Sequence, residues 1–222
     1  MENKTGTYLK YAIGEIILVV IGILIALQIN TWQQQSKDRT LEKRYLANIT
    51  EELKKDSVAL RENYLKLERQ AETKNPFLDM LIEGKKKDSL IAYFNLQWRP
   101  IYPYTPMKST FEEMTSSSHL NIIKSNSLRG AIVKMYNSYE DLEKDEDFLI
   151  EYFKNLVNEL SRNIPSIYNP NIDDILALGK DNYVMNSMRL NGAYTRLSNY
   201  KEKLEECSAL LEQIKNYQMS VK

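Results

Sequence analysis

The side chains that most often carry out catalysis or bind metals are few and scattered in this sequence. It has one histidine, His119, and one cysteine, Cys207, and neither lies in a CxxC or HExxH spacing. Its acidic pairs are sequence neighbours, which point to different faces of a helix and make poor acid–base pairs: Glu112–Glu113, Asp173–Asp174 and Glu205–Glu206. A glycine-rich phosphate loop is also missing. We therefore expect no catalytic residue, no cofactor and no metal site, and a protein that is not an enzyme.

The residues best suited to binding lie in an irregular, proline-rich segment. Trp98, Arg99, Tyr102 and Tyr104 fall in residues 98–106, which contain three prolines within seven residues. Aromatic and arginine side chains are typical of binding hot spots, so these four residues form a candidate interaction surface. The alternative is that they cap the end of a helical bundle and fill its core, and this is the interpretation that the sequence favours.

Helices must position these residues, because apolar side chains recur at steps of three and four along most of the chain. Long amphipathic helices are predicted over residues 37–73, 127–162 and 191–218, and short ones over 77–82, 89–96, 108–117 and 174–178. Pro76 is expected to end the first long helix. The second carries Glu146 at an apolar position, and we expect it to bend or loop out there. With no strand pattern, the sequence predicts an all-α fold in which residues 33–222 form one antiparallel helical-bundle domain.

Residues 11–32 have the length and composition of a transmembrane helix, preceded by a short tail over residues 1–10. Twenty-two helical residues measure about 33 Å, close to the thickness of a bilayer core. Tyr8, Tyr11 and Trp32 flank the span as an aromatic belt. The apolar run is long and no small-x-small cleavage site follows it, which favours a retained anchor over a cleaved signal peptide.

Glu15, Gly22 and Ala26 fall on one face of this predicted span, at spacings of seven and four. Gly22 and Ala26 form a small-xxx-small pattern, which lets two helices approach closely. One interpretation is an oligomer interface in which Glu15 is protonated or paired across the contact. The other is that Glu15 reaches up to the headgroups and the small residues are incidental.

Charge and cysteine content limit the partners. Thirty Lys and Arg residues balance thirty Asp and Glu residues, so there is no electrostatic reason to expect nucleic acid. The lipid bilayer and a second copy of the chain are the expected partners. A single cysteine excludes an intrachain disulfide and is compatible with either side of a membrane. The Lys and Arg residues that flank the span favour a cytoplasmic location for the domain.

Residues 8–32, YLKYAIGEIILVVIGILIALQINTW, closely resemble the N-terminal signature of a family of single-span envelope proteins of the Bacteroidota, classified as a domain of unknown function. Residues 110–124, TFEEMTSSSHLNIIK, are similar to that family's central motif, in which glycine usually stands where this chain has Ser118. The resemblance implies an inner-membrane anchor with its domain in the periplasm, opposite to the charge count. It implies no activity and supplies no catalytic residues.

We therefore expect a membrane-anchored, non-enzymatic envelope protein that acts as a scaffold or assembly partner. It would self-associate through the span and bind an envelope protein that the sequence does not identify. The alternative is a ligand-binding or sensory helical module that works with a separate membrane partner.

Overall fold

The computed structural model describes residues 4–221, with side chains from residue 13 onward. The regular secondary structure of that part of the chain is all helical and it holds no strand, which confirms the predicted all-α class. The elements are α1 (Lys4–Glu83), α2 (Leu90–Trp98), α3 (Ser109–Ser116), the 3-10 helix η1 (His119–Ile122), α4 (Asn126–Asn163), α5 (Ile172–Ala177), the 3-10 helix η2 (Leu178–Lys180), α6 (Asn182–Arg189) and α7 (Ala193–Ser220). The predicted tail falls partly outside the described residues, and from Lys4 the chain is already helical.

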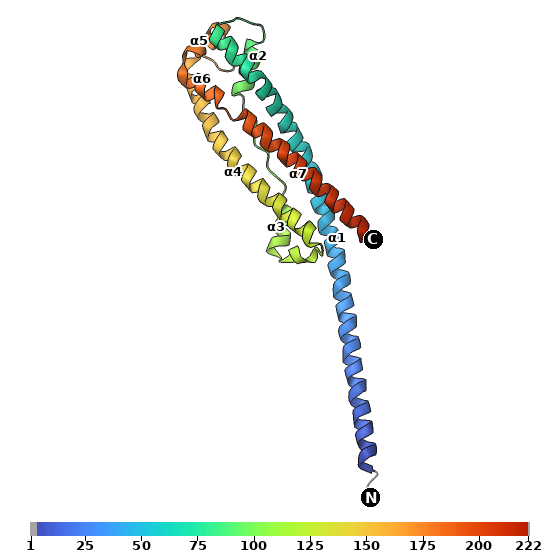
Figure 1. The fold of residues 1–222 in the computed structure, drawn as a ribbon. Coiled ribbons are helices and arrows are strands. Elements are labelled where there is room, and N and C mark those ends of the chain that lie inside the picture. Colours follow the sequence, from blue (N-terminus) through green and yellow to red (C-terminus); the bar gives the residue numbers. More distant parts are fainter. Residues whose placement is uncertain (1–3, 222) are drawn as a thin grey trace.

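The first helix, α1, has two halves with different surroundings. Its 80 residues correspond to about 120 Å, and its N-terminal half projects from the bundle as a single rod (Figure 1). The side chains of residues 13–32 are exposed and mostly apolar, and the helix is long and apolar enough to cross a membrane. Of the predicted aromatic belt, Trp32 is exposed, whereas Tyr8 and Tyr11 lie outside the residues whose side chains are described.

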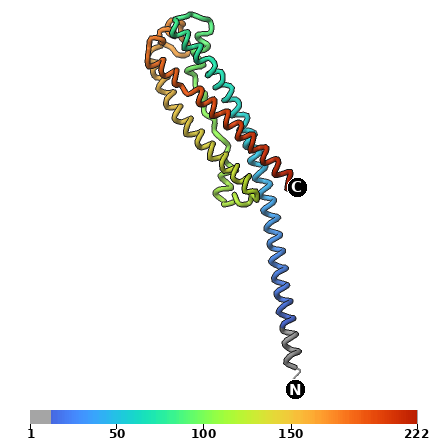
Figure 2. The backbone as a smooth tube through the Cα atoms, viewed as in Figure 1, coloured from blue at the N-terminus to red at the C-terminus, as the bar shows by residue number. Residues whose placement is uncertain are grey.

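The bundle consists of the second half of α1 together with α4 and α7. Tyr217 donates to Glu42 (2.7 Å) and Tyr194 to the carbonyl of Ala71 (3.1 Å), so α7 runs opposite to α1. Helix α4 runs in the same direction as α1, and α7 ends beside the middle of α1 (Figures 1 and 2). The core is built from the apolar stripes of these three helices, which include Leu53, Ile132 and Leu210.

Carboxylates of α1 hold the segment that returns from α2 to α4. Each accepts a backbone N–H: Glu42 from Lys124 (2.9 Å), Glu52 from Thr110 (3.1 Å) and Asp56 from Met107 (3.1 Å). The order of these contacts shows that the returning segment runs antiparallel to α1. Backbone donors of this segment are thereby paired without a strand partner.

Two predicted interruptions of helices are wrong. Pro76 lies inside α1, which continues to Glu83 and includes the separately predicted helix over residues 77–82. Proline in a helix interior costs about 3 kcal/mol; burial of the apolar side chains that follow, such as Phe77 and Leu81, offsets this cost. Helix α4 is also continuous through Glu146, which points inward and is 2% exposed.

The far end of the bundle has a second core, formed by the last turns of α1 with α2, α5, α6 and the end of α4. Helix α6 was not predicted from the sequence. Gly179 lies in η2 against the last turn of α1, where an added Cβ would be 2.5 Å from the carbonyl oxygen of Leu81. Only glycine permits this close approach.

Candidate functional site

A half-open groove lies between α4 and the proline-rich segment, with a cavity volume of about 360 Å³. We call it the α4 groove. Its floor is apolar and comes from α4: Leu149, Ile150, Phe153 and Val157. Its opposite wall comes from the proline-rich segment and the loop after α4: Trp98, Arg99, Ile101, Tyr102, Pro103 and Tyr168. A largely apolar concavity with a few polar groups is the usual form of a small-molecule site.

The groove exists because one apolar stripe of α4 packs against the second core at its end and faces the proline-rich segment before it. Leu156 and Leu160 are buried in the second core, whereas Leu149 and Phe153, at equivalent spacing, are only partly covered. The proline-rich segment cannot form a helix that would pack closely against them, because proline lacks the N–H and clashes with the preceding turn. The floor of the groove is therefore left accessible.

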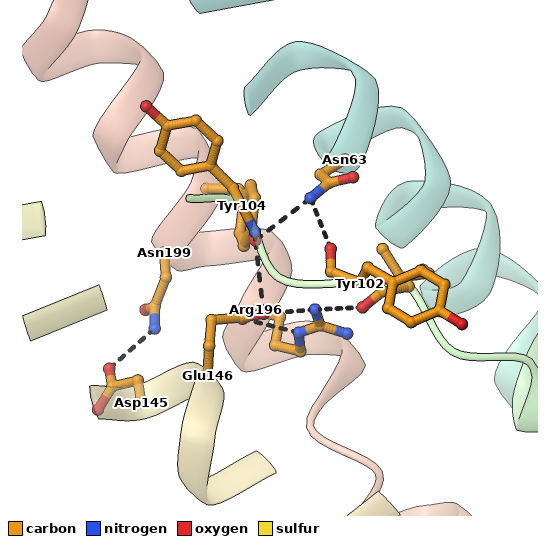
Figure 3. Close-up of polar contacts among 9 residues, drawn as sticks. Asn63, Tyr102, Tyr104, Asp145, Glu146, Arg196 and Asn199 are labelled. Atoms are coloured by element: carbon orange, nitrogen blue, oxygen red, sulfur yellow. Dashed lines mark hydrogen bonds and ion pairs between the residues drawn. The ribbon is translucent and has the colours of Figure 1, made fainter. Parts of the chain in front are cut away.

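A buried ion pair includes one of the residues that line the groove, Arg196. Arg196 of α7 donates to both carboxylate oxygens of Glu146, at 2.8 and 2.5 Å, and to the carbonyl oxygen of Ile101 at 2.9 Å. Figure 3 shows Arg196 between Glu146 and the proline-rich segment. The hydroxyl of Tyr200, also on α7, accepts a hydrogen bond from the backbone N–H of Tyr104 (3.0 Å). Arg196 and Tyr200 together fix the path of the proline-rich segment.

The predicted interaction residues separate into two sets. Trp98, Arg99 and Tyr102 line the α4 groove. Trp98 is only 2% exposed in its wall, whereas Tyr102 is 76% exposed. The guanidinium of Arg99 lies over the Trp98 ring, 5.7 Å from its centroid. Tyr104 points to the opposite side of the segment (Figure 3) and is buried in the bundle core.

Tyr104 belongs to a buried polar cluster with Asp56 and Tyr139. Asp56 Oδ2 and both tyrosine hydroxyls are buried and have no hydrogen-bond partner within the described part of the chain. Burial raises the pKa of the Asp56 carboxyl and the pKa of both phenols. Burial thus disfavours the charged form of each group, and the cluster has the character of a core contact.

The two residues that first suggested chemistry have structural contacts. The Tyr45 hydroxyl lies 2.8 Å from Nδ1 of His119 and 3.0 Å from Glu113, which ties η1 and α3 to α1. Cys207 is fully buried, with Sγ 3.0 Å from the Ser57 hydroxyl. Burial raises the pKa of this thiol, which makes it a poor nucleophile at neutral pH.

The structure keeps Glu15, Gly22 and Ala26 on the exposed, apolar part of α1. No side chain of the described bundle covers them, and nothing lies within 4 Å of a Cβ added at Gly22. Sequence reasoning missed the groove residues Phe153 and Tyr168 and the Arg196 contact. A signal for the last was present, because a carboxylate at an apolar heptad position needs a buried cation as partner.

These features define an all-helical protein with a single N-terminal helix long and apolar enough to span a membrane and a bundle that carries one well-formed groove among its described residues. The chain belongs to a family of unknown function (DUF6090), whose model matches residues 15–170. The matched range includes the apolar part of α1 from Glu15, the proline-rich segment and all of α4. No curated protein and no solved structure matches the chain.

Proposed function

We propose that this protein is a membrane-anchored, non-enzymatic scaffold whose helical domain is held upright by the same helix that crosses the bilayer. The observation that carries the proposal is the continuity of α1. Its exposed apolar residues 13–32 lead, without a break, into residues such as Tyr45 and Leu53 that are fully buried in the bundle. A flexible linker would let the domain tumble, whereas one helix fixes its distance and direction from the membrane.

The resemblance of residues 8–32 to single-span envelope proteins supports an inner-membrane location with the domain in the periplasm. Buried Cys207 makes this orientation easy to test, because the native chain offers no accessible thiol among its described residues. Cysteines introduced at the exposed positions Ser36 and Lys215 are treated with a membrane-impermeant maleimide. Labelling in cells with only the outer membrane permeabilised is the expected result. Labelling only after the inner membrane is lysed would reverse the orientation, and recovery in the soluble fraction would refute anchoring.

Self-association through Glu15, Gly22 and Ala26 completes the scaffold proposal. The face is exposed, and small residues allow a second helix to approach closely. Gly22→Ile should reduce the crosslinked dimer in native membranes, whereas Leu24→Phe, on the opposite side of the helix, should not. Equal crosslinking of both variants and the native chain would refute this interface.

A second function, ligand binding, is favoured by the α4 groove. A scaffold needs no open cavity, yet this one keeps an apolar floor of α4 side chains partly accessible to solvent. The domain would then act as a ligand-binding module that works with a separate membrane partner. Thermal-shift measurements with a panel of small amphiphiles, on the native chain and on Phe153→Ala, test this function. Stabilisation of the native chain alone is expected, and no shift with any compound would refute it.

A further inference from the structure

The charges around the α4 groove are of one sign. Its ionisable lining residues that carry charge at neutral pH are Arg99, Lys154 and Arg196, and no carboxylate lines it. Arg196 is already neutralised by Glu146. Lys154 has only an exposed pair with Glu151 at 3.2 Å, which solvent screens.

Arg99 is the cation left available. It is exposed and forms no ion pair with any residue that the structure describes, and its guanidinium lies over the ring of Trp98 in the wall of the groove. A planar guanidinium on an aromatic face keeps its edge donors free for a carboxylate. The groove therefore combines a cationic wall residue with an apolar floor.

We propose that the α4 groove binds a small amphiphilic anion, namely an unbranched acyl carboxylate. The carboxylate pairs with Arg99, with Lys154 nearby, and the hydrocarbon lies along Leu149, Phe153 and Val157. Leu149 and Val157 are eight residues apart on α4, or about 12 Å along the helix, which limits the hydrocarbon of the ligand to medium length. The inference rests on the ligand-binding function proposed above.

The ligand comes from solution and not from the bilayer that surrounds the anchor. The groove contacts α1 at Gln70, 38 residues beyond Trp32, or about 57 Å along the helix. A lipid of that bilayer would have to leave the membrane completely to reach Trp98.

Tryptophan fluorescence provides a direct test, because the chain has only two tryptophans, Trp32 and Trp98. In the full chain carrying Trp32→Phe, reconstituted in phosphatidylcholine vesicles, Trp98 alone reports. Brominated hexanoate, octanoate and decanoate should quench it saturably. Affinity should rise about fourfold per methylene until the chain exceeds the length of the floor.

Matched arginine variants test the anionic end. Arg61 lies over the Tyr64 ring at 5.7 Å, the same distance as Arg99 over Trp98, but it does not line the groove. Arg99→Gln should weaken bromo-octanoate binding by roughly tenfold, and Arg61→Gln should leave it within about twofold. Equal effects of the two variants would overturn the assigned carboxylate position.

Brominated octanol and octylammonium distinguish ligand binding in general from the preference for an anion. Weaker quenching by both than by the carboxylate is expected. If either quenches saturably and the carboxylate does not, the groove binds ligands but the anionic class is wrong. If none quenches saturably, both the ligand class and the ligand-binding function are overturned. One further result would mean that a second copy of the chain fills the groove. In that case no ligand quenches Trp98, and Trp98 emission changes with the protein-to-lipid ratio in the absence of ligand.

Discussion

Replacing Glu146 and Arg196 separately and together should show that these two residues stabilise the bundle only as a pair. Glu146 is 2% exposed and the Arg196 side chain 11%, so each charge has little water to replace its partner. In the variant Glu146→Leu, an apolar residue fills the gap in the heptad pattern of α4, but the guanidinium is left unpaired. In Arg196→Met, the carboxylate keeps only a 3.4 Å contact with the Tyr200 hydroxyl.

The two single substitutions should differ in cost. Removing one partner of a buried pair costs about 3–5 kcal/mol. We expect about 3 kcal/mol for Glu146→Leu, because Arg196 keeps its bond to the carbonyl of Ile101 at the edge of the groove. Arg196→Met should cost about 4–5 kcal/mol, because it leaves the carboxylate of Glu146 unpaired and Glu146 is more deeply buried than Arg196. The double variant leaves the carbonyl of Ile101 and the hydroxyl of Tyr200 each one hydrogen-bond partner short, and it should cost about 2 kcal/mol.

Urea unfolding of the full chain in detergent micelles, followed by far-ultraviolet circular dichroism, measures these differences. The expected coupling free energy is about 5–6 kcal/mol, the difference between the summed single costs and the double cost. Single costs that add to the double cost within about 0.5 kcal/mol would refute the pairing. Fold integrity of each variant is checked from an unchanged helical signal without urea.

The other predictions concern single positions and are measured as thermal midpoints. Asp56→Asn should raise the midpoint at pH 7 by roughly 2–4 °C. Burial raises the pKa of the Asp56 carboxyl in the folded state. The contribution of Asp56 to stability is therefore favourable below its unfolded pKa and is lost as pH rises through the folded pKa. Ser118, at φ 57°, is left-handed, so Ser118→Gly should stabilise the fold by about 1 kcal/mol, whereas Ser117→Gly at φ −88° should not. Gly179→Ala should destabilise by about 1–3 kcal/mol, but Gly130→Ala, at an open position inside α4, should stabilise by about 1 kcal/mol.

Each of these has a result that would contradict it. The gain from Asp56→Asn must shrink as pH falls toward 4, and a gain independent of pH would assign it to packing. Equal responses at Ser117 and Ser118 would remove the backbone explanation. A neutral Gly179→Ala would mean that η2 can move away from α1 at no cost.

Much of the helical framework was predictable, because it depends on local spacing. The long stripes that became α4 and α7 differ from the structure by one or two residues at their ends. Pro76 was not predictable in this way. Its local cost is offset by the burial of Phe77 and Leu81 against helices from elsewhere in the chain, and no local pattern records that partner.

The α4 groove was only half visible in the sequence. The cluster of Trp98, Arg99 and Tyr102 was apparent as a candidate surface, but Phe153 has the same heptad spacing as fully buried Leu160. A heptad pattern identifies the inward face of a helix and not what lies opposite. Glu146 was the available clue, since a carboxylate on that face requires a cation, yet the sequence offers thirty candidates for it.

Because α1 is one unbroken helix, a change in the tilt of its N-terminal part moves the whole domain. From Trp32 to Glu83 the helix extends about 75 Å, so a change of about 10° in the tilt of the span would swing its far end by roughly 13 Å. Transmembrane helices change tilt when the bilayer becomes thinner or thicker. Membrane thickness, or a neighbour that leans on the span, would thus be converted into displacement of the bundle tip.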